Sequence, residues 1–154
     1  TRITHIVDII RRRGTPHQIE QLIANTAKHD GHAVKIGIEQ EPGSAGKALT
    51  DHYRRNILEG YTLKTPRPTG DKTTRAQPLA SAAESGYIRL ITAPWNNAFI
   101  EEAVLFPTGP HDDQIDAIVG AHTLLTTTRH QETPMPISIT NDDCGLDPLH
   151  HPHF

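Results

Sequence analysis

The stretch AVKIGIEQEPGSAG (residues 33–46) decides the fold class, because a short apolar segment leads through a glycine-rich turn into a helix. The helix is indicated by Leu49, Tyr53 and Ile57, which recur every four positions. In α/β folds, ligand-binding groups lie where a strand ends in such a turn. Glu39 stands at that point and is the first candidate functional residue. The same pattern fits a solvated strand-end carboxylate equally well.

A second strand and helix come before this stretch. Residues 3–10 (ITHIVDII) are rich in β-branched residues and predict a strand. Thr15 is a good N-cap, Pro16 suits the first helical position, and Gln18 completes a capping box. The helix is expected to end at Gly31. The chain therefore begins as strand, helix, strand, helix.

The alternation continues after this stretch. We expect a short strand at residues 61–65 and, after a proline-containing loop, a helix with an alanine-rich face and a strand at residues 87–91. A short amphipathic helix and a last strong helix, starting near His111, follow. The predicted apolar positions of these three helices are Ala76, Leu79, Ala80 and Ala83; Trp95, Phe99 and Phe106; and Ile115, Ile118, Val119, His122 and Leu125.

These elements predict an α/β domain with helices on both faces of a mixed sheet. The 154 residues suffice for one domain, which we assign to residues 1–129. Residues 130–154 are polar and contain several prolines and histidines, so we expect a flexible tail. The chain enters an apolar run almost at once from Thr1, which is typical of a piece of a longer protein.

Bulk properties exclude several classes of protein. The formal net charge of -3 excludes a chain that binds nucleic acid over its whole surface, so any DNA contact must be local. Cys144 is the only cysteine, which excludes an internal disulfide and a zinc site built on paired cysteines. No apolar run is long enough to span a membrane, and no signal peptide is visible.

Acidic residues gather at the start of the last predicted helix. Asp112 and Asp113 lie four and three residues before Asp116, so both can approach it across one helical turn. The helix dipole alone would favour Asp112 and Asp113 there. Asp116 borders the apolar stripe at Val119, where a carboxylate is costly unless a metal or a donor offsets it. Hydrolysis of a phosphodiester with two divalent ions requires such converging carboxylates.

A loop at residues 67–75 (RPTGDKTTR) combines three cations with several hydroxyl groups before a helix. This mixture is typical of phosphate binding, and it also fits a solvated loop with a helix cap at Thr73. Residues 43–47 (GSAGK) resemble half of a nucleotide-binding loop but lack its full glycine spacing and its Lys-Ser/Thr ending. ATP binding is therefore rejected there.

Four motifs occur in an order that resembles the C-terminal nuclease domain of phage large terminase subunits. They are HIVDIIRRRGTPHQIE, IGIEQEPGSAGK, RPTGDKTTRAQPLASAAESGYIRL and FPTGPHDDQIDAI, and the similarity covers about residues 3–125. The resemblance implies a ribonuclease-H-like fold that cuts concatemeric viral DNA with two Mg²⁺ or Mn²⁺ ions. It implies Glu39, Asp113 and Asp116 as catalytic residues, with Asp112 in the same metal-binding motif.

The resemblance also implies partners and a location. We expect double-stranded DNA to contact Lys47, Arg67, Lys72 and Arg75, and we expect portal and other terminase proteins as partners. We expect the cytoplasm of a bacterial host as the location, without membrane association. In the family, a first catalytic aspartate lies on a strand before residues 3–10, and Asp8 does not match it. We therefore expect this chain to lack that strand and the preceding ATPase.

Two alternative functions follow from the same residues. Holliday-junction resolvases share an Asp-x-x-Asp pair at their final helix, and they prefer branched DNA. A catalytically incomplete prophage remnant would only bind DNA or packaging proteins. The loop at residues 67–75 favours the terminase interpretation.

Overall fold

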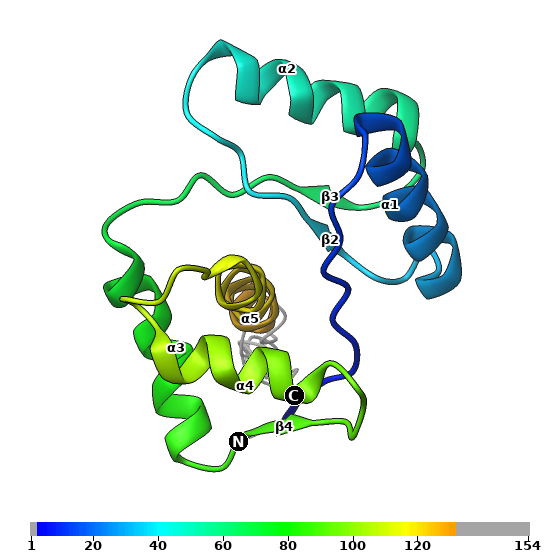
Figure 1. The fold of residues 1–154 in the computed structure, drawn as a ribbon. Coiled ribbons are helices and arrows are strands. Elements are labelled where there is room, and N and C mark those ends of the chain that lie inside the picture. Colours follow the sequence, from blue (N-terminus) through cyan, green and yellow to red (C-terminus); the bar gives the residue numbers. More distant parts are fainter. Residues whose placement is uncertain (1–2, 132–154) are drawn as a thin grey trace, which may run out of the picture.

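The computed structural model describes residues 3–131 as an alternation of short strands and helices (Figure 1). The predicted order is confirmed, and the tail expected at residues 130–154 lies outside the described residues except for the end of the last helix. The elements are β1 (Thr4–Ile6), α1 (Pro16–Asp30), β2 (Ile36–Gly37), α2 (Ser44–His52), η1 (Tyr53–Ile57, a π-helical turn), β3 (Leu63–Lys64), α3 (Lys72–Glu84), β4 (Ile88–Leu90), α4 (Asn96–Leu105) and α5 (Asp113–Gln131).

The strands form two parallel pairs. β1 pairs with β4, with Thr4 opposite Ile88, and β2 pairs with β3, with Ile36 opposite Leu63. Within residues 3–131 the two pairs are not joined, so the single mixed sheet is not observed in this part of the chain. The other edges of β1 and β2 carry no strand partner there. The α/β class is confirmed, and the continuous mixed sheet stays a prediction.

The first helix forms as its terminal residues predict. The Thr15 hydroxyl accepts the Gln18 N–H at 3.4 Å, and the Gln18 side chain accepts the Thr15 N–H at 2.9 Å. This capping box satisfies two donors that would otherwise lack partners. Gly31 ends the helix with φ of 83°, a left-handed conformation that glycine adopts without strain, and its N–H bonds to the Ala27 carbonyl.

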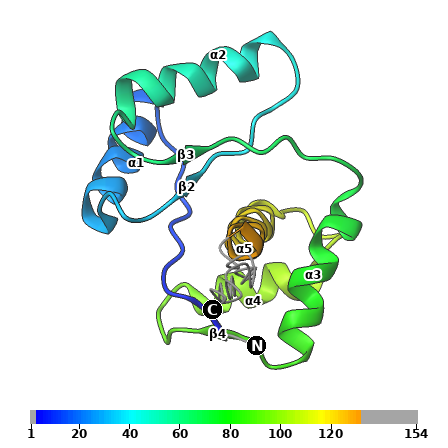
Figure 2. The ribbon, with the colours of Figure 1, turned by 180° about the vertical axis from the view of Figure 1, so that it is seen from behind.

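Helix α5 lies at the centre of the molecule. In Figures 1 and 2, β2 and β3 lie between α5 on one side and α1 with α2 on the other. On its remaining sides, α5 packs against α3 and α4. The strand pair that carries Glu39 at its end therefore faces the helix that begins with the acidic cluster.

The hydrophobic core fills the space among α3, α4 and α5. Ala76, Phe99, Ile115 and Val119 are buried, and Leu90 of β4 is among the apolar residues that pack against them. Burial of a large apolar side chain contributes about 1.5–3 kcal/mol each, so these contacts fix α5 in place.

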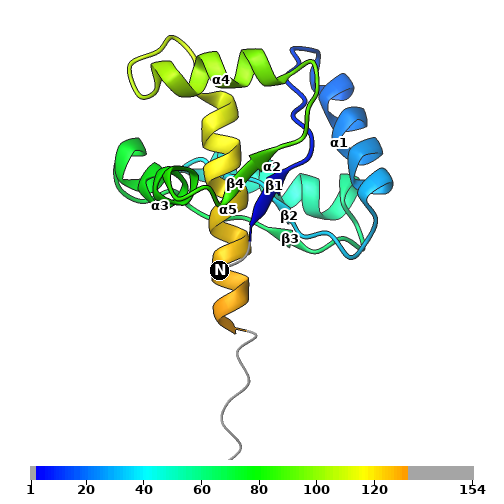
Figure 3. The ribbon, with the colours of Figure 1, turned by 90° about the horizontal axis from the view of Figure 1, so that it is seen from below.

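Four residues predicted on apolar helical faces are exposed. Leu49 is 53% exposed and Leu125 is 45% exposed, and Ala80 and Ala83 are exposed too, so the assignment of these four residues to buried faces was wrong. Figure 3 shows that α5 continues beyond the elements that cover its first half, and residue 125 belongs to the second half of this helix. Among the described residues, no helix has both the length and the apolar character that crossing a membrane requires.

Candidate active site

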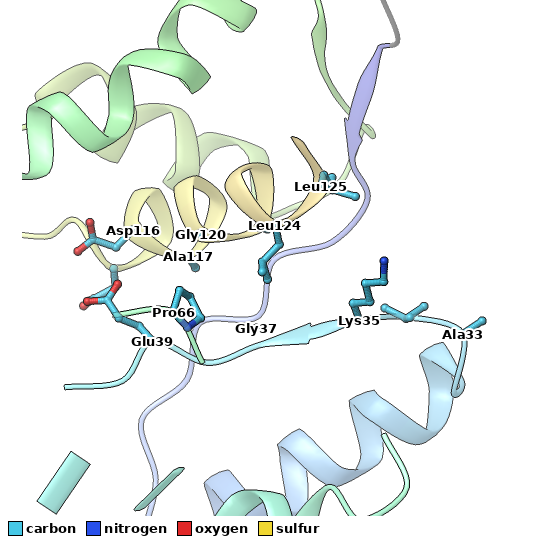
Figure 4. Close-up of a pocket in the computed structure, with 13 residues that line it drawn as sticks. Ala33, Lys35, Gly37, Glu39, Pro66, Asp116, Ala117, Gly120, Leu124 and Leu125 are labelled. Atoms are coloured by element: carbon cyan, nitrogen blue, oxygen red, sulfur yellow. The ribbon is translucent and has the colours of Figure 1, made fainter. Parts of the chain in front are cut away.

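A pocket of about 870 Å³ lies between β2 and α5. Three of the four predicted acidic residues, Glu39, Asp113 and Asp116, line it. Figure 4 shows Glu39 and Asp116 at the same end of the pocket, with Lys35 toward the other end. Beyond Asp113 and Asp116, the residues of α5 that line the pocket are small residues and leucines. The carboxylates therefore supply most of the polar groups at the end of the pocket where Glu39 and Asp116 lie.

Glu39 reaches this pocket because extended backbone pairing continues past β2. The Ile38 N–H donates to the Lys64 carbonyl at 3.0 Å, and the Gln40 N–H donates to the Pro66 carbonyl at 3.1 Å. Glu39 lies between these two anchored residues, and its side chain is 49% exposed. The strand end therefore presents a carboxylate that water and ions can reach.

The turn after Glu39 requires glycine at two positions. Gly43 has φ of 98°, in the left-handed region. Gly46 lies so close to the Glu41 carbonyl that a Cβ at this position would overlap it. The glycine-rich sequence that predicted the turn therefore has a steric cause, because the start of α2 packs directly on the chain next to Glu39.

The acidic cluster forms the first turn of α5. The Asp116 N–H donates to the Asp112 carbonyl at 2.9 Å, which starts the helix. The side chains of Asp112 and Asp116 are 30% and 26% exposed, whereas that of Asp113 is 75% exposed. Asp112 does not line the pocket that contains the other three acids.

Two cations of α3 neutralise these acids. The Lys72 Nζ donates to the Oδ2 atoms of Asp112 at 2.5 Å and of Asp116 at 2.9 Å. Arg75 lies 3.5 Å from the Glu39 carboxylate and 3.9 Å from that of Asp116. Arg75 thus joins the two sides of the pocket, and its buried Nε has no hydrogen-bond partner among the described residues.

These contacts raise the pKa of Lys72 above its ordinary value of 10.5, first through Asp112 and then through Asp116. Because the pKa of Lys72 is higher in the folded chain, its charge contributes stability fully below pH 10.5. This contribution is lost only as the pH rises through the pKa of Lys72 in the folded chain. Lys72 is therefore an ammonium ion at neutral pH, positioned between two carboxylates.

The four cations predicted to contact DNA fall into two groups. Lys72 and Arg75 form ion pairs with the acids of the pocket. Lys47 and Arg67 are exposed and form no ion pair within residues 3–131. Only Lys47 and Arg67 therefore have unpaired charge for an external phosphate, because the other two already face carboxylates.

Sequence reasoning missed Glu102, which holds the first turn of α5. Its side chain is 3% exposed, and it accepts the N–H groups of Gln114 at 2.6 Å and Ile115 at 3.1 Å. It also accepts the side-chain amide of Gln114 at 2.6 Å, and Arg11 lies 3.7 Å away. Glu102 therefore supplies acceptors to helix N–H groups that no residue of α5 satisfies. An acidic residue in the middle of an apolar helix was the only available signal.

The comparison with known families agrees with this geometry. A family model described as the terminase RNaseH-like domain matches residues 2–125, which include every acid of the pocket. The chain belongs to the terminase RNaseH-like domain family. The predicted resemblance to the nuclease domain of a phage large terminase is thereby confirmed. In the same comparisons, no curated protein and no solved structure matched the chain.

The donors of this terminase RNaseH-like domain fit a hard divalent cation in their chemistry. Carboxylate oxygens are the ligands that Mg²⁺ and Mn²⁺ prefer, and the Lys72 ammonium shows that Asp112 and Asp116 together accept a positive charge. In the part of the chain that the structure describes, no group of three or more acidic, histidine or cysteine side chains is close enough to hold a metal ion.

Asp71 gives this region of the terminase domain a pH dependence, because it caps the helix that carries Lys72 and Arg75. Its carboxylate accepts the Thr74 N–H at 2.8 Å and the Thr74 hydroxyl at 2.7 Å, so Asp71 is the N-cap rather than Thr73. These bonds lower the pKa of Asp71 below its ordinary value of 3.8. Because the pKa of Asp71 is lower in the folded chain, its ionised carboxylate contributes stability above pH 3.8. This contribution is lost as the pH falls through the pKa of Asp71 in the folded chain.

We therefore expect an Asp71→Ala variant to unfold at a lower temperature than the parent chain near neutral pH. This gap between the two unfolding temperatures should narrow in acid. Thermal unfolding followed by circular dichroism at several pH values measures this gap. Asp51→Ala, which removes an exposed acid from α2, is the control. A gap that stays constant down to about pH 2 contradicts the role of Asp71 as an ionised cap.

Proposed function

We propose that this domain is a Mg²⁺- or Mn²⁺-dependent endonuclease that cuts concatemeric viral DNA during genome packaging. The observation that carries the proposal is the pocket between β2 and α5, which Glu39, Asp113 and Asp116 line in a chain of the terminase RNaseH-like domain family. Glu39 is separated from the two aspartates by most of the domain in sequence, and two different elements of the fold carry them.

Each charged residue of the pocket has a role in this proposal. Glu39, Asp113 and Asp116 would hold the divalent cations, and these ions would supply activation of an attacking water and stabilisation of the leaving oxygen. Lys72 offsets the charge of Asp116 and keeps Asp112 beside it. Asp112 would be a further metal ligand if its ion pair with Lys72 opened. Arg75 holds Glu39 and Asp116 at a fixed separation.

Double-stranded DNA is the proposed substrate, and its backbone contacts Lys47 and Arg67, whose charges are exposed and unpaired within residues 3–131. Both flank segments that lead to the pocket, since Lys47 follows the turn after Glu39 and Arg67 follows Pro66. Portal and other terminase proteins are the proposed partners, in the cytoplasm of a bacterial host.

Metal titration combined with plasmid nicking tests the proposal. We expect the chain to bind Mn²⁺ and to nick supercoiled plasmid only when Mg²⁺ or Mn²⁺ is present, and both properties to disappear in a Glu39→Ala/Asp113→Ala double variant. Full nicking by the double variant overturns the assignment. Mn²⁺ binding by the parent chain no tighter than by an Asp113→Ala variant favours the incomplete remnant instead.

A comparison of substrates separates the proposal from the Holliday-junction alternative. A terminase nuclease is expected to cut linear and supercoiled duplexes, whereas a junction resolvase prefers four-way DNA. Preference for four-way over linear DNA of the same sequence would favour the resolvase interpretation.

A further inference from the structure

Three consecutive arginines, Arg11, Arg12 and Arg13, lie between β1 and α1, and the proposed function assigns no role to them. All three are exposed. Together with Ile10 and Asp113 they line a hollow of about 610 Å³. Figure 3 shows this segment rising from β1 to the end of the molecule where α4 lies. Asp113 also lines the acidic pocket, so the two hollows share one wall.

Arg11 fixes this segment to the start of α5. Its guanidinium lies 3.7 Å from the buried carboxylate of Glu102 and 3.6 Å from that of Asp113. A cation beside a buried carboxylate is held more firmly than one in a solvated surface pair, because solvent screens the interaction less. The arginine segment is therefore held against the helix that carries the acids.

Arg12 and Arg13 differ from Arg11 because no carboxylate of the described residues pairs with them. Neither forms an ion pair within 4 Å among residues 3–131. Two adjacent, uncompensated guanidinium groups in a chain of net charge -3 form a local basic surface. An acidic pocket repels a phosphate backbone, so a nuclease site of this kind needs cations at its margin.

We propose that Arg12 and Arg13 bind phosphate oxygens of the DNA backbone and hold the strand beside the acidic pocket. The proposal rests on the proposed function for its substrate. The planar fork of arginine matches the oxygens of a phosphate, and contacts to the backbone carry no sequence preference. Asp113 lines both hollows, so a phosphate bound here lies next to the acidic pocket. Arg11 acts as the anchor, and its two neighbours make the contact.

The salt dependence of DNA binding tests this proposal. The probe is a short fluorescent duplex titrated with the full chain in EDTA at several salt concentrations. Arg12→Gln/Arg13→Gln is expected to weaken binding and to reduce the slope of log K against log salt by about 1.8, since each lost phosphate contact removes about 0.9. The matched control is Arg54→Gln/Arg55→Gln, which removes the same charge from η1.

Affinity and slope equal to those of the parent chain overturn the proposal, and so does an equal loss in the control. A thermal midpoint equal to that of the parent shows that the arginine variant is folded. If the glutamine variant is not folded, Arg12→Lys/Arg13→Lys replaces it, because this variant keeps the charge. It is expected to retain the salt slope and to bind DNA several-fold more weakly than the parent chain. A DNA affinity equal to that of the parent chain counts against the role of the guanidinium groups.

Mn²⁺ titration of the same proteins separates this proposal from the proposed function. The arginine variant is expected to bind Mn²⁺ no more weakly than the parent chain, because neither arginine touches the pocket of Glu39 and Asp116. A parent chain that binds no Mn²⁺ but shows the arginine-dependent slope refutes the metal-dependent nuclease and keeps the DNA contact. If the parent chain binds Mn²⁺ but the slope does not depend on the arginines, the DNA contact of Arg12 and Arg13 is refuted and the metal-dependent nuclease is kept.

Discussion

Asparagine at position 116 is expected to lower Mn²⁺ affinity and Mn²⁺-dependent nicking by at least about 100-fold, since loss of groups that only support metal ligands already costs about 10–100-fold. The Asp116→Asn change keeps the shape of the side chain and removes its charge. Asp116 is the acid that both Lys72 and Arg75 approach, so its carboxylate is the most strongly oriented in the pocket. Calorimetric titration with Mn²⁺ and a plasmid nicking assay measure the two effects.

Asp51→Asn is the matched control for this prediction. Asp51 is an exposed acid on α2 that pairs only with its neighbour Arg54 in the described part of the chain, and its replacement should change neither quantity. An Asp116→Asn variant with parental Mn²⁺ affinity would remove Asp116 from the proposed metal ligands. Equal losses in both variants would show that general surface charge, rather than the pocket, attracts the metal.

Alanine at position 102 is expected to lower the free energy of unfolding by about 3 kcal/mol, because buried donors that lose their partner cost about 1–3 kcal/mol each. Glu102 accepts two backbone N–H groups and one side-chain amide, and its carboxylate is 3% exposed. In the Glu102→Ala variant, the first turn of α5 loses all three acceptors at once. Urea unfolding followed by circular dichroism gives the free energy.

The neighbouring residue supplies the control, since Glu101 is exposed and its replacement by alanine should change stability by less than about 0.5 kcal/mol. A conservative change tests the hydrogen bonds themselves. Glu102→Gln keeps an acceptor oxygen for the N–H groups of Gln114 and Ile115 and removes the charge. We expect it to lose less stability than Glu102→Ala. Equal stability of the Glu101 and Glu102 alanine variants would contradict the capping role.

Helix boundaries were predicted well where local chemistry decides them. Thr15, Gln18 and Gly31 delimit α1 because capping bonds and a positive φ depend on residues close together in sequence. The strand at residues 3–10 was predicted too long, since only Thr4–Ile6 has a parallel partner in β4. Strand length depends on the partner, which the local pattern does not reveal.

The sequence indicated acids that line one pocket, but not the ion pairs that the neighbouring cations form. Glu39 and Asp116 could be found from a strand end and from a carboxylate beside an apolar stripe. Lys72 was predicted to contact DNA, yet it lies between two aspartates that are 40 and 44 residues further along the chain. Which charges pair across such separations depends on the packing of α3 against α5, and sequence periodicity contains no information on that contact.

The pairing of β1 with β4 has a consequence for folding kinetics. Thr4 lies opposite Ile88, so this contact closes a loop that spans most of the described residues, whereas β2 and β3 are joined by a single helical crossover. Closing such a loop costs conformational entropy before the distant contact can stabilise the chain. Topologies rich in distant contacts therefore fold slowly. We therefore expect the β2 and β3 pair to form before the β1 and β4 pair, and the arginine segment that follows β1 to take its place after β2 and β3 have paired.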